Sequence, residues 1–350
     1  MDLKKIFDKI SKQNSLLELD LKNKTVLTEA ATGPYFVTPF IAAMAGAEVV
    51  AFVKDSKYGK ADDVIRMNEN IRDKYFKNLR LVFTDKIEEK VLRESDVITN
   101  SGHLRPLDKR MLSKVKADCV IPLMYEAWEY RETDIDLEFC KERNIKVGAT
   151  NERHSGVEVF KYLGDMAIKL ILDSGLSLYR NKFVLICNND FGPFIANTLS
   201  KVCESIGVID VHERKDLYIK IKEVDFIGDF PEIIIPDKYR DADGIIFTAY
   251  PFDKSWIGSE DSDISVDKLL KEFNDPFLLR FAGDVDTKSL TSAGIKFYPE
   301  EVKSGHMGIL PSDIGFDPVV KLQSGGLKAA QLMMERKTDY RNESLVELMS

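Results

Sequence analysis

The sequence predicts an α/β protein with two Rossmann-like, doubly wound parallel-sheet domains and a cleft between them. Short apolar runs rich in β-branched residues alternate with helical stretches, as expected for a parallel sheet covered by helices on both faces. The alternation starts again at "NKFVLI", from residue 181, after a long helical stretch. At 350 residues and 44% hydrophobic content, the chain is long enough to form two domains.

An amphipathic helix opens the first half, because Leu3, Ile6, Phe7 and Ile10 share one helical face. Strands are then expected at residues 26–28, 49–53, 79–83, 97–99, 119–123 and 146–148. Helices between these strands imply right-handed crossovers and a parallel sheet.

The halves are joined by a helix expected over residues 157–172 rather than by a flexible linker. We therefore predict a first domain at residues 1–155 and a second, dinucleotide-binding domain at residues 156–316. The segment "DPVVKLQSGGLKAAQLMMERK" is helical in pattern, and a C-terminal helix within residues 317–350 is placed to pack back on the first domain.

Three segments of the first half have counterparts in the same order in the second half. "GPYFVTPFIAAMAGAEVVAF" corresponds to "GPFIANTLSKVCESIGVIDV", "SDVITNS" to "ADGIIFTAY", and "DIDLEFCKERNIKV" to "DVDTKSLTSAGIKF". The matches indicate an internal duplication, although independent α/β units also resemble one another. In either case, ligands are expected at the carboxyl ends of the strands.

Composition narrows the possible partners. A net charge of −8 disfavours binding to nucleic acid or to an anionic membrane surface.

The four cysteines form no CxxC pair and suggest buried free thiols. There is no signal-peptide pattern and no apolar run long enough to span a membrane, so a cytoplasmic protein is expected. No His or Cys spacing suggests a metal site.

The turn after the first strand of the first half contains Gly33-Pro34. Glycine permits a close approach of the backbone, and a helix start offers amides and a positive dipole end to a phosphate. Asp55 lies 22 residues after Gly33, where a ribose-binding acid would be expected. Gly33 and Asp55 are therefore candidate cofactor-binding residues.

The equivalent turn of the second half, "CNNDFGPF", has Cys187 and Asn189 at the first two positions of a GxGxxG pattern and keeps Gly192 at the third. Candidate cofactor-binding residues here are Asn189, Gly192, Pro193, Phe194 and Glu213, the last of them 21 residues after Gly192. This turn either still binds a cofactor in a modified pocket, or belongs to a Rossmann-like unit that is kept only as a scaffold.

From about residue 151 onward the chain resembles the D-2-hydroxyacid dehydrogenase (formate/glycerate dehydrogenase-like) superfamily. The resemblance rests on "ATNERHSGVEVFKYLGDMAIKLILDSGLSLYRNKFVLICNNDFGPFIANTL", "YRDADGIIFTAYP" and "SGHMG". It implies two α/β domains, NAD or NADP as cofactor, a homodimer and a catalytic histidine at His306. The family's catalytic arginine would fall on Ala282, with Arg280 two positions earlier.

Polar residues also follow several strands of the first half. If these strands are parallel neighbours, their loops meet at one edge of the sheet. The candidates there are His103, Arg105, Glu126, Arg131, Glu152 and His154. An imidazole beside a carboxylate supports proton transfer near neutral pH, and arginine can hold a carboxylate or phosphate. Local salt bridges on the surface are the alternative interpretation.

The leading hypothesis is an NAD(P)-dependent oxidoreductase acting on a small polar or anionic metabolite. In it, Gly192 and Glu213 hold the cofactor, His306 or His103 exchanges a proton and Arg105 orients the substrate. A non-catalytic ligand-binding or scaffold protein is one alternative. A transferase using S-adenosylmethionine is another, because its strand-end acid would look the same.

Overall fold

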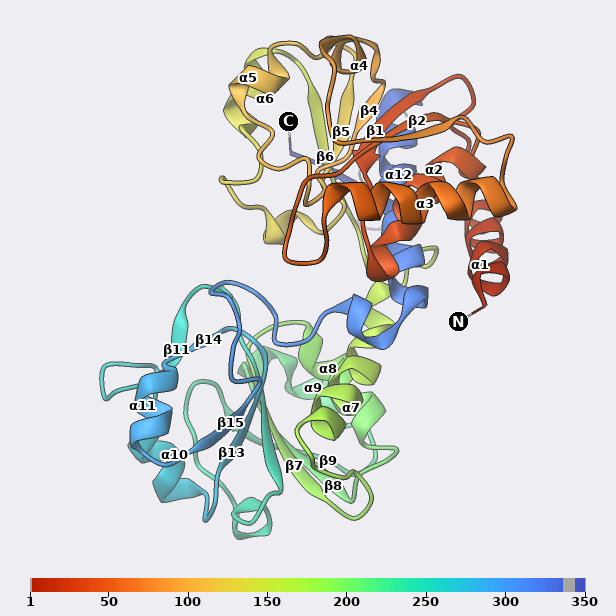
Figure 1. The fold of residues 1–350 in the computed structure, drawn as a ribbon. Coiled ribbons are helices and arrows are strands. Elements are labelled where there is room, and N and C mark those ends of the chain that lie inside the picture. Colours follow the sequence, from red (N-terminus) through yellow and green to blue (C-terminus); the bar gives the residue numbers. More distant parts are fainter. Residues whose placement is uncertain (1, 336–343, 350) are drawn as a thin grey trace. The chain divides into compact units, whose positions relative to one another are not determined.

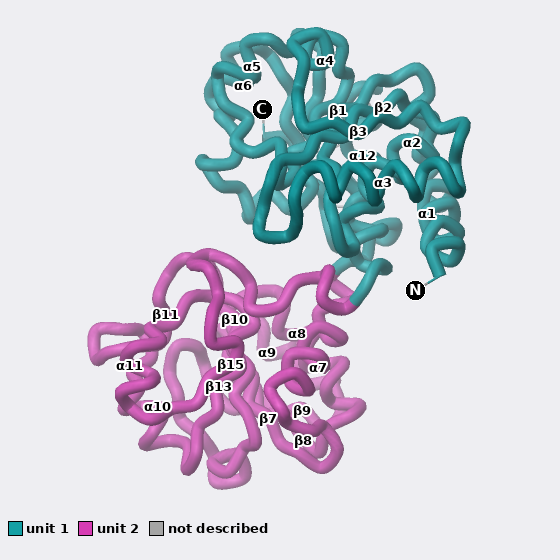
Figure 2. Tube along the Cα trace, in the orientation of Figure 1, with its two compact units in different colours: residues 1–159, 315–350 teal, residues 160–314 magenta. Residues whose placement is uncertain are grey.

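The computed structural model describes residues 2–335 and 344–349, and the chain divides into two compact units (Figure 2). Unit 1 comprises Met1–Val159 and Gly315–Ser350, and unit 2 comprises Phe160–Ile314. The boundaries expected from the sequence, after residues 155 and 316, lie close to these. Unit 2 is therefore an insertion between two segments of unit 1.

Unit 1 is built on one sheet (Figure 1). Its strands are β1 (Thr25–Glu29), β2 (Glu48–Phe52), β3 (Leu81–Thr84), β4 (Val97–Ile98), β5 (Val120–Pro122), β6 (Lys146–Thr150) and β16 (Val346–Leu348). The order is β16-β6-β5-β4-β1-β2-β3, and the strands are parallel except β16, which pairs antiparallel with β6. The parallel strands thus follow the order 3-2-1-4-5-6 of a dinucleotide-binding domain.

Helices cover both faces of this sheet. They are α1 (Leu3–Leu16), α2 (Val37–Met44), α3 (Ala61–Tyr75), α4 (Glu89–Glu94), α5 (Lys109–Leu112), α6 (Leu137–Glu142) and α12 (Phe316–Glu335). Successive residues of β1 point to opposite faces, as the pleat requires. Val26 packs in the core formed with α1, α2 and α12, whereas Leu27 packs in the core formed with α4, α5 and α6.

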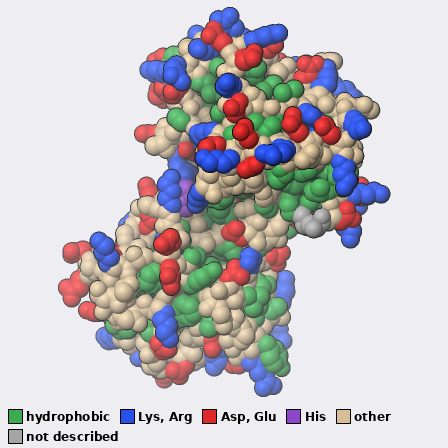
Figure 3. All heavy atoms as spheres, in the orientation of Figure 1, with side chains coloured by type: hydrophobic (Ala, Val, Ile, Leu, Met, Phe, Trp, Pro, Cys, Tyr) green, Lys and Arg blue, Asp and Glu red, His purple; other side chains and the backbone are tan. Residues whose placement is uncertain are grey.

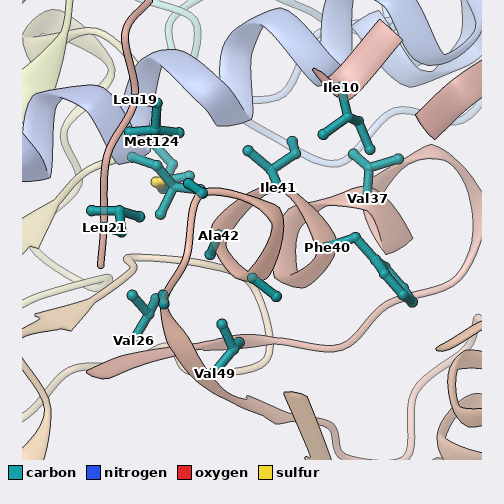
Figure 4. Packing of buried hydrophobic residues seen from close by; sticks show 14 of the residues in the cluster. Ile10, Leu19, Leu21, Val26, Val37, Phe40, Ile41, Ala42, Val49 and Met124 are labelled. Carbon is teal, nitrogen blue, oxygen red and sulfur yellow. The ribbon is translucent and has the colours of Figure 1, made fainter. Parts of the chain in front are cut away.

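The first of these cores shows why the C-terminal helix belongs to unit 1. Ile41 of α2 and Ile10 of α1 are fully buried beside α12 (Figure 4). Leu327 and Met333 of α12 are fully buried in the same cluster. Burying each such side chain contributes about 1.5–3 kcal/mol, so α12 is an integral part of the core of unit 1.

Unit 2 repeats the architecture. Its main sheet contains β7 (Lys182–Cys187), β8 (Ser205–Asp210), β9 (Val224–Asp229), β10 (Gly244–Thr248), β13 (Phe277–Ala282) and β15 (Lys296–Tyr298), in the order β15-β13-β10-β7-β8-β9. A small sheet contains β11 (Ser255–Gly258), β12 (Ile264–Ser265) and β14 (Asp284–Val285). The helices are α7 (Leu163–Asp173), α8 (Phe191–Leu199), α9 (Lys215–Tyr218), α10 (Val266–Glu272) and α11 (Thr287–Ser292).

The prediction of two Rossmann-like α/β domains is therefore confirmed, and the three paired segments occupy equivalent places. Gly33 and Gly192 both lie at the helix start after the first strand of their sheets. β4 and β10 both pair with that first strand, on the side away from the second strand. α6–β6 and α11–β15 both supply the last parallel strand. The internal duplication remains our interpretation of this equivalence.

Two elements differ from expectation. The helix expected at residues 157–172 begins as a 3₁₀ turn at Val159–Tyr162 and becomes α-helical at Leu163. The C-terminal helix ends at Glu335 in the described residues, and Val346–Leu348 form a strand because β6 offers an open edge for pairing. Residues 336–343 lie outside the described part of the chain.

Charged side chains of both signs are spread over the visible surface of both units (Figure 3), and the net charge of the whole sequence is −8. Within residues 2–335 and 344–349, no helix has both the length and the apolar character needed to cross a membrane. In the same residues, no group of three or more His, Cys, Asp or Glu side chains is arranged to hold a metal ion.

Candidate functional site

The turn after β1 lies at the point where the sheet of unit 1 changes direction, between β1 and β4. Gly33 adopts φ +59°, and a Cβ built on it would have no neighbour within 4 Å. Thr32 precedes the 3₁₀ turn Gly33–Phe36, and its side chain does not cap it. Gly33 is exposed, and its lack of a side chain leaves open space at this turn.

Glu29 and His103 are linked at the same edge. The Glu29 carboxylate is 8% exposed and accepts a hydrogen bond from the His103 amide at 3.1 Å. Burial raises the pKa of Glu29 above its ordinary value. His103 Nδ1 accepts from the Lys54 amide at 3.3 Å, and burial together with Lys54 lowers the pKa of the imidazole. His103 is therefore neutral near pH 7, with its proton on Nε2.

Arg105 is engaged within unit 1. Its Nε donates to the Asn100 carbonyl and side-chain oxygens at 3.1 and 3.0 Å, and its Nη1 lies 3.3 Å from Asp134. The guanidinium also stacks 5.2 Å from the centre of the Tyr125 ring. Arg131 lies 3.9 Å from the same Asp134 carboxylate. These contacts brace the ends of β4 and β5, so Arg105 is better described as a structural cation than as a substrate anchor.

A cavity of about 360 Å³ lies between the residues that follow β2 and β4, and we call it the β2–β4 slot. Its apolar lining consists of Phe52, Ile87, Leu92, Leu104 and Met111. Its polar lining includes Lys54, His103, Arg105, Asp108, Arg110 and Lys114. An apolar interior with a mostly cationic polar lining suits a ligand with a flat or apolar body and an anionic group.

Glu126, Glu129 and Glu152 meet after β5 and β6, and we call them the carboxylate cluster. Glu126 Oε1 accepts from the Glu152 amide at 3.1 Å, and Glu129 Oε1 accepts from the Glu126 amide at 3.3 Å. Glu126 and Glu129 form a reciprocal capping box around the 3₁₀ turn Ala127–Glu129. The predicted convergence of Glu126 and Glu152 is thus observed, and Glu129 joins them.

Burial within the carboxylate cluster favours protonated carboxyls. It raises the pKa of Glu129 to about 7, and the neighbouring Glu126 charge acts in the same direction. Burial and Glu129 raise the pKa of Glu152 well above its ordinary value. The Glu126 carboxylate accepts from the Trp128 indole N–H, and its Oε2 lies 3.6 Å from Arg153 Nη2. The cluster therefore stores protons near neutral pH.

A second cavity, of about 740 Å³, adjoins this cluster. It is lined by Glu126, Trp128, Thr150, Asn151 and Arg153, together with residues of β16 and its flanks. A carboxylate, a guanidinium and an indole thus face one space at the carboxyl edge of the sheet. The His154 imidazole makes a hydrogen bond within its own loop, because its Nδ1 accepts from the Gly156 amide at 3.0 Å.

The turn after β7 in unit 2 is filled by its own side chains. Asn189 Oδ1 accepts from the Phe191 amide at 3.1 Å, and its Nδ2 donates to Thr248 at 3.0 Å. Asn188 exchanges two hydrogen bonds with the Tyr250 backbone, at 3.0 and 2.8 Å. These bonds bridge the ends of β7 and β10, the position where a dinucleotide would cross the sheet.

Close packing around position 192 explains why the residue there is a glycine. A Cβ at this position would lie 2.3 Å from the Tyr218 hydroxyl and 2.6 Å from Cys187 Sγ. Phe194 of the same helix packs edge-to-face on Phe160 at 5.5 Å, and Pro193 brings no amide to the helix start. The three residues therefore fix α8 against its surroundings.

The acid at the end of the second strand of unit 2 is Asp210 rather than Glu213, which corrects the sequence prediction. β8 ends at Asp210, and Glu213 lies beyond it on the exposed 3₁₀ turn His212–Arg214. Asp210 is fully buried, accepts from the Tyr218 hydroxyl at 2.5 Å and lies 3.4 Å from Arg214. Burial raises the pKa of Asp210.

Asp55 of unit 1 has a comparable structural role. Its carboxylate accepts from the Ala61 amide at 2.9 Å and from Lys60 Nζ at 2.7 Å, so it holds the start of α3. These bonds lower the pKa of Asp55. Lys54, rather than Asp55, is the residue after β2 that lines the β2–β4 slot.

His306 lies on a loop anchored to β13 and β14. Arg280, 4% exposed, pairs with Asp284, and this carboxylate accepts from the Gly305 amide at 3.2 Å and from the Ser304 hydroxyl. His306 Nδ1 lies 3.0 Å from the Ser304 carbonyl. Arg280 therefore positions the loop of His306 through Asp284.

No family model and no curated protein sequence matches the chain. Among solved structures, the chain is similar to dipicolinate synthase A chain from Bacillus subtilis, with 12% identity, 92% of this chain and 100% of that chain covered, and a TM-score of 0.60. It is also similar to the corresponding dipicolinate synthase chain from Bacillus halodurans, with 13% identity, coverages of 90% and 98%, and a TM-score of 0.54. The chain therefore shares its fold with these two dipicolinate synthase chains.

The strand order of both main sheets raises the question of where a dinucleotide would fit. In unit 2 the Phe191 amide is already bonded to Asn189, and Asp190 and Asp210 beside the turn are both paired with Arg214, which also donates to the Asn188 carbonyl. That turn does not fit a pyrophosphate as it stands. In unit 1 the corresponding turn has an exposed Gly33 with open space beside it.

Sequence reasoning missed Glu129, Lys54, Asp210 and Tyr218. Glu129 had a usable signal, because Glu126 and Glu129 have the spacing of a capping box. The contact between Tyr218 and Asp210 had no such signal, since it depends on how α9 packs beside β8.

Proposed function

We propose that the protein is an oxidoreductase that uses NAD or NADP and acts on a small polar or anionic metabolite. The observation that carries the proposal is the carboxylate cluster beside the cavity of about 740 Å³ in unit 1. It lies at the carboxyl edge of a sheet with the strand order of dinucleotide-binding domains. Titratable groups with shifted pKa values beside a cavity are typical of active sites.

The cluster supplies the proton exchange that such a reaction needs. When bound, the nicotinamide ring would exchange a hydride with the substrate carbon. Glu126 lines the cavity and faces the substrate, while Glu129 and Glu152 contact Glu126 and hold a proton. Because the pKa of Glu129 is about 7, both of its protonation states are populated at neutral pH.

Arg153 gives the same cavity a preference for anions. Its guanidinium lies 3.6 Å from Glu126 and lines the cavity beside Trp128. A guanidinium can hold a substrate carboxylate through two parallel hydrogen bonds. In this proposal Arg153 takes the orienting role that the sequence assigned to Arg105.

The test is a fluorescence titration with NADH and NADPH, followed by turnover assays with a panel of small hydroxy and oxo acids. Glu126→Gln should lower kcat by about 100-fold or more, because the variant cannot accept a proton. Dinucleotide binding should be unchanged. Glu132→Gln, on the exposed surface nearby, is the matched control. Full activity of Glu126→Gln, or no binding of either dinucleotide, would refute the proposal.

A non-catalytic ligand-binding protein is the second candidate, and the filled turn of unit 2 favours it. Asn188 and Asn189 take the hydrogen bonds that a cofactor would otherwise make there. In that case neither NADH, NADPH nor S-adenosylmethionine should bind in calorimetric titrations. Binding of S-adenosylmethionine alone would indicate a transferase.

The proposed assembly is a cytoplasmic homodimer without nucleic-acid or membrane partners. The dimer rests on the resemblance to the dehydrogenase superfamily. Light scattering of the purified protein tests it, and a mass equal to one chain, 39.8 kDa, would exclude it.

A further inference from the structure

The β2–β4 slot of unit 1 shares no lining residue with the cavity beside the carboxylate cluster. Its volume of about 360 Å³ falls in the size range of sites for small ligands. The proposed reaction assigns no role to this slot, and its lining indicates a ligand of a different kind.

Apolar side chains from separate elements converge on the slot. Leu92 of α4 and Leu104 of the loop after β4 are buried members of one core cluster. Phe52, Ile87 and Met111 pack against that core but are only partly buried. Phenylalanine rings pair favourably with other aromatic rings, and so does the sulfur of methionine. The apolar part of the slot therefore suits an aromatic ring, which would complete the burial of these side chains.

Two cations of the lining are available to an anion. Lys54 follows β2 and Arg110 lies on α5, and both are exposed. Within residues 2–335 and 344–349, neither of their charged groups has a carboxylate within 4 Å. The Lys54 Nζ donates to the Arg105 carbonyl at 3.1 Å, which uses one of its three donors.

The other charged groups of the lining already have partners. Lys114 Nζ lies 3.3 Å from Glu89, and Arg105 Nη1 lies 3.3 Å from Asp134. Asp108, the acid of the lining, caps the start of α5. Cations thus outnumber acids around the slot, so the charge that faces it is positive.

We propose that the β2–β4 slot binds an aromatic carboxylate, with its ring against Phe52 and Met111 and its carboxylate held by Arg110. A guanidinium can hold a carboxylate through two parallel hydrogen bonds, and Lys54 supplies a second cation to the same cavity. Burial of the ring removes apolar surface of both the ligand and the slot from water. This site is distinct from the proposed active site, and the inference does not depend on oxidoreductase activity.

The test is isothermal titration calorimetry of the full chain with 3-phenylpropionate, 3-phenylpropan-1-ol, propionate and hexanoate. The phenylpropionate should bind about tenfold more tightly than the alcohol, which lacks the charge, and than propionate, which lacks the ring. Hexanoate keeps the charge on a flexible alkyl chain. It should bind about threefold more weakly than the phenylpropionate, because the contacts of an aromatic ring with Phe52 and Met111 are lost.

Variants of the two cations separate the charge from the ring. Lys54→Met and Arg110→Gln should each weaken the phenylpropionate by about fivefold and leave the alcohol unchanged. Lys109→Gln is the matched control, because Lys109 precedes Arg110 on α5 and does not line the slot.

Methyl NMR during the same titration locates the ligand. The Met111 methyl resonance should shift as the phenylpropionate is added, because Met111 lines the slot. The resonance of Met333, which is fully buried on α12, should stay in place.

Several results would overturn the inference. Equal affinity for the phenylpropionate and its alcohol, or unchanged binding in both Lys54→Met and Arg110→Gln, would exclude a carboxylate site. Hexanoate binding as tight as that of the phenylpropionate would exclude the preference for aromatic ligands. Weakening by Arg153→Gln in place of Arg110→Gln would move the ligand to the cavity of the carboxylate cluster. None of these results depends on dinucleotide binding or turnover, so the proposed function is tested separately.

Discussion

Arg280 pairs with Asp284, and the same carboxylate accepts hydrogen bonds from Ser304 and Gly305. One buried ion pair therefore connects strand β13 to the loop of His306. Arg280 also donates through Nε to the Gly283 carbonyl at 2.9 Å. These contacts of Arg280 all lie within unit 2, where they give the arginine a structural role.

We expect Arg280→Met to lower the free energy of unfolding by about 3 kcal/mol, because it leaves the largely buried Asp284 without its cation. Urea unfolding followed by circular dichroism measures the change. Lys169→Met is the control, since it removes an exposed pair with Asp173 and should cost less than about 1 kcal/mol. Equal effects of the two substitutions would contradict a structural role for Arg280.

The carboxylate cluster should make stability depend on pH. The pKa of Glu129 rises from 4.5 to about 7 on folding, so the folded state binds more protons than the unfolded state between these values. Stability is therefore lost as the pH rises through this range, and Glu129 alone accounts for about 3 kcal/mol of the loss. In Glu129→Gln this decline should flatten, whereas Glu132→Gln should retain it. Denaturant midpoints measured from pH 4 to pH 8 provide the comparison.

A double-mutant cycle tests the packing of Gly192. Gly192→Ala should destabilise the protein by about 2 kcal/mol, because the new methyl group meets the buried Tyr218 hydroxyl at 2.3 Å. Tyr218→Phe removes that hydroxyl and the hydrogen bond to Asp210, at about 1–3 kcal/mol. Thermal denaturation of the double variant should show a smaller loss than the sum of the single losses. Strict additivity would mean that the two groups do not touch.

His103 should titrate below the ordinary imidazole value of 6.5, since burial and Lys54 both disfavour its charged form. Its contribution to stability is then lost as the pH falls below 6.5, because the unfolded state binds the proton first. Nitrogen-resolved NMR of the imidazole should show the Nε2–H tautomer at pH 7. A midpoint at or above 6.5 would contradict the contact with the Lys54 amide.

The sequence was sufficient for the fold class and insufficient for the strand order. Apolar runs such as "KFVLIC" identify buried strands because each is bounded by polar or turn residues. Their neighbours in the sheet depend on contacts between residues far apart in the chain. Strand β16 could not be foreseen, because a strand of three residues becomes stable only through its pairing with β6.

The sequence predicted which side chains lie together where strand ends were clear. Glu126 and Glu152 were expected to converge, and they follow two strands that are adjacent in the sheet. Glu213 was placed at the strand end by its distance of 21 residues from Gly192, but "VIDVHE" also contains Asp210, and periodicity does not decide where β8 ends. Arg105 was expected to face a ligand, but Asp134 lies within reach of its guanidinium, and no local pattern reveals that partner.

The insertion of unit 2 has a consequence for synthesis on the ribosome. Residues 160–314 form a continuous unit, so they can complete their folding as soon as they emerge. Unit 1 emerges first but lacks the buried side chains of α12 until translation passes Glu335. The first part of the chain to be made thus reaches its native state last, and the apolar residues of α2 that pack against α12 stay exposed in the interval.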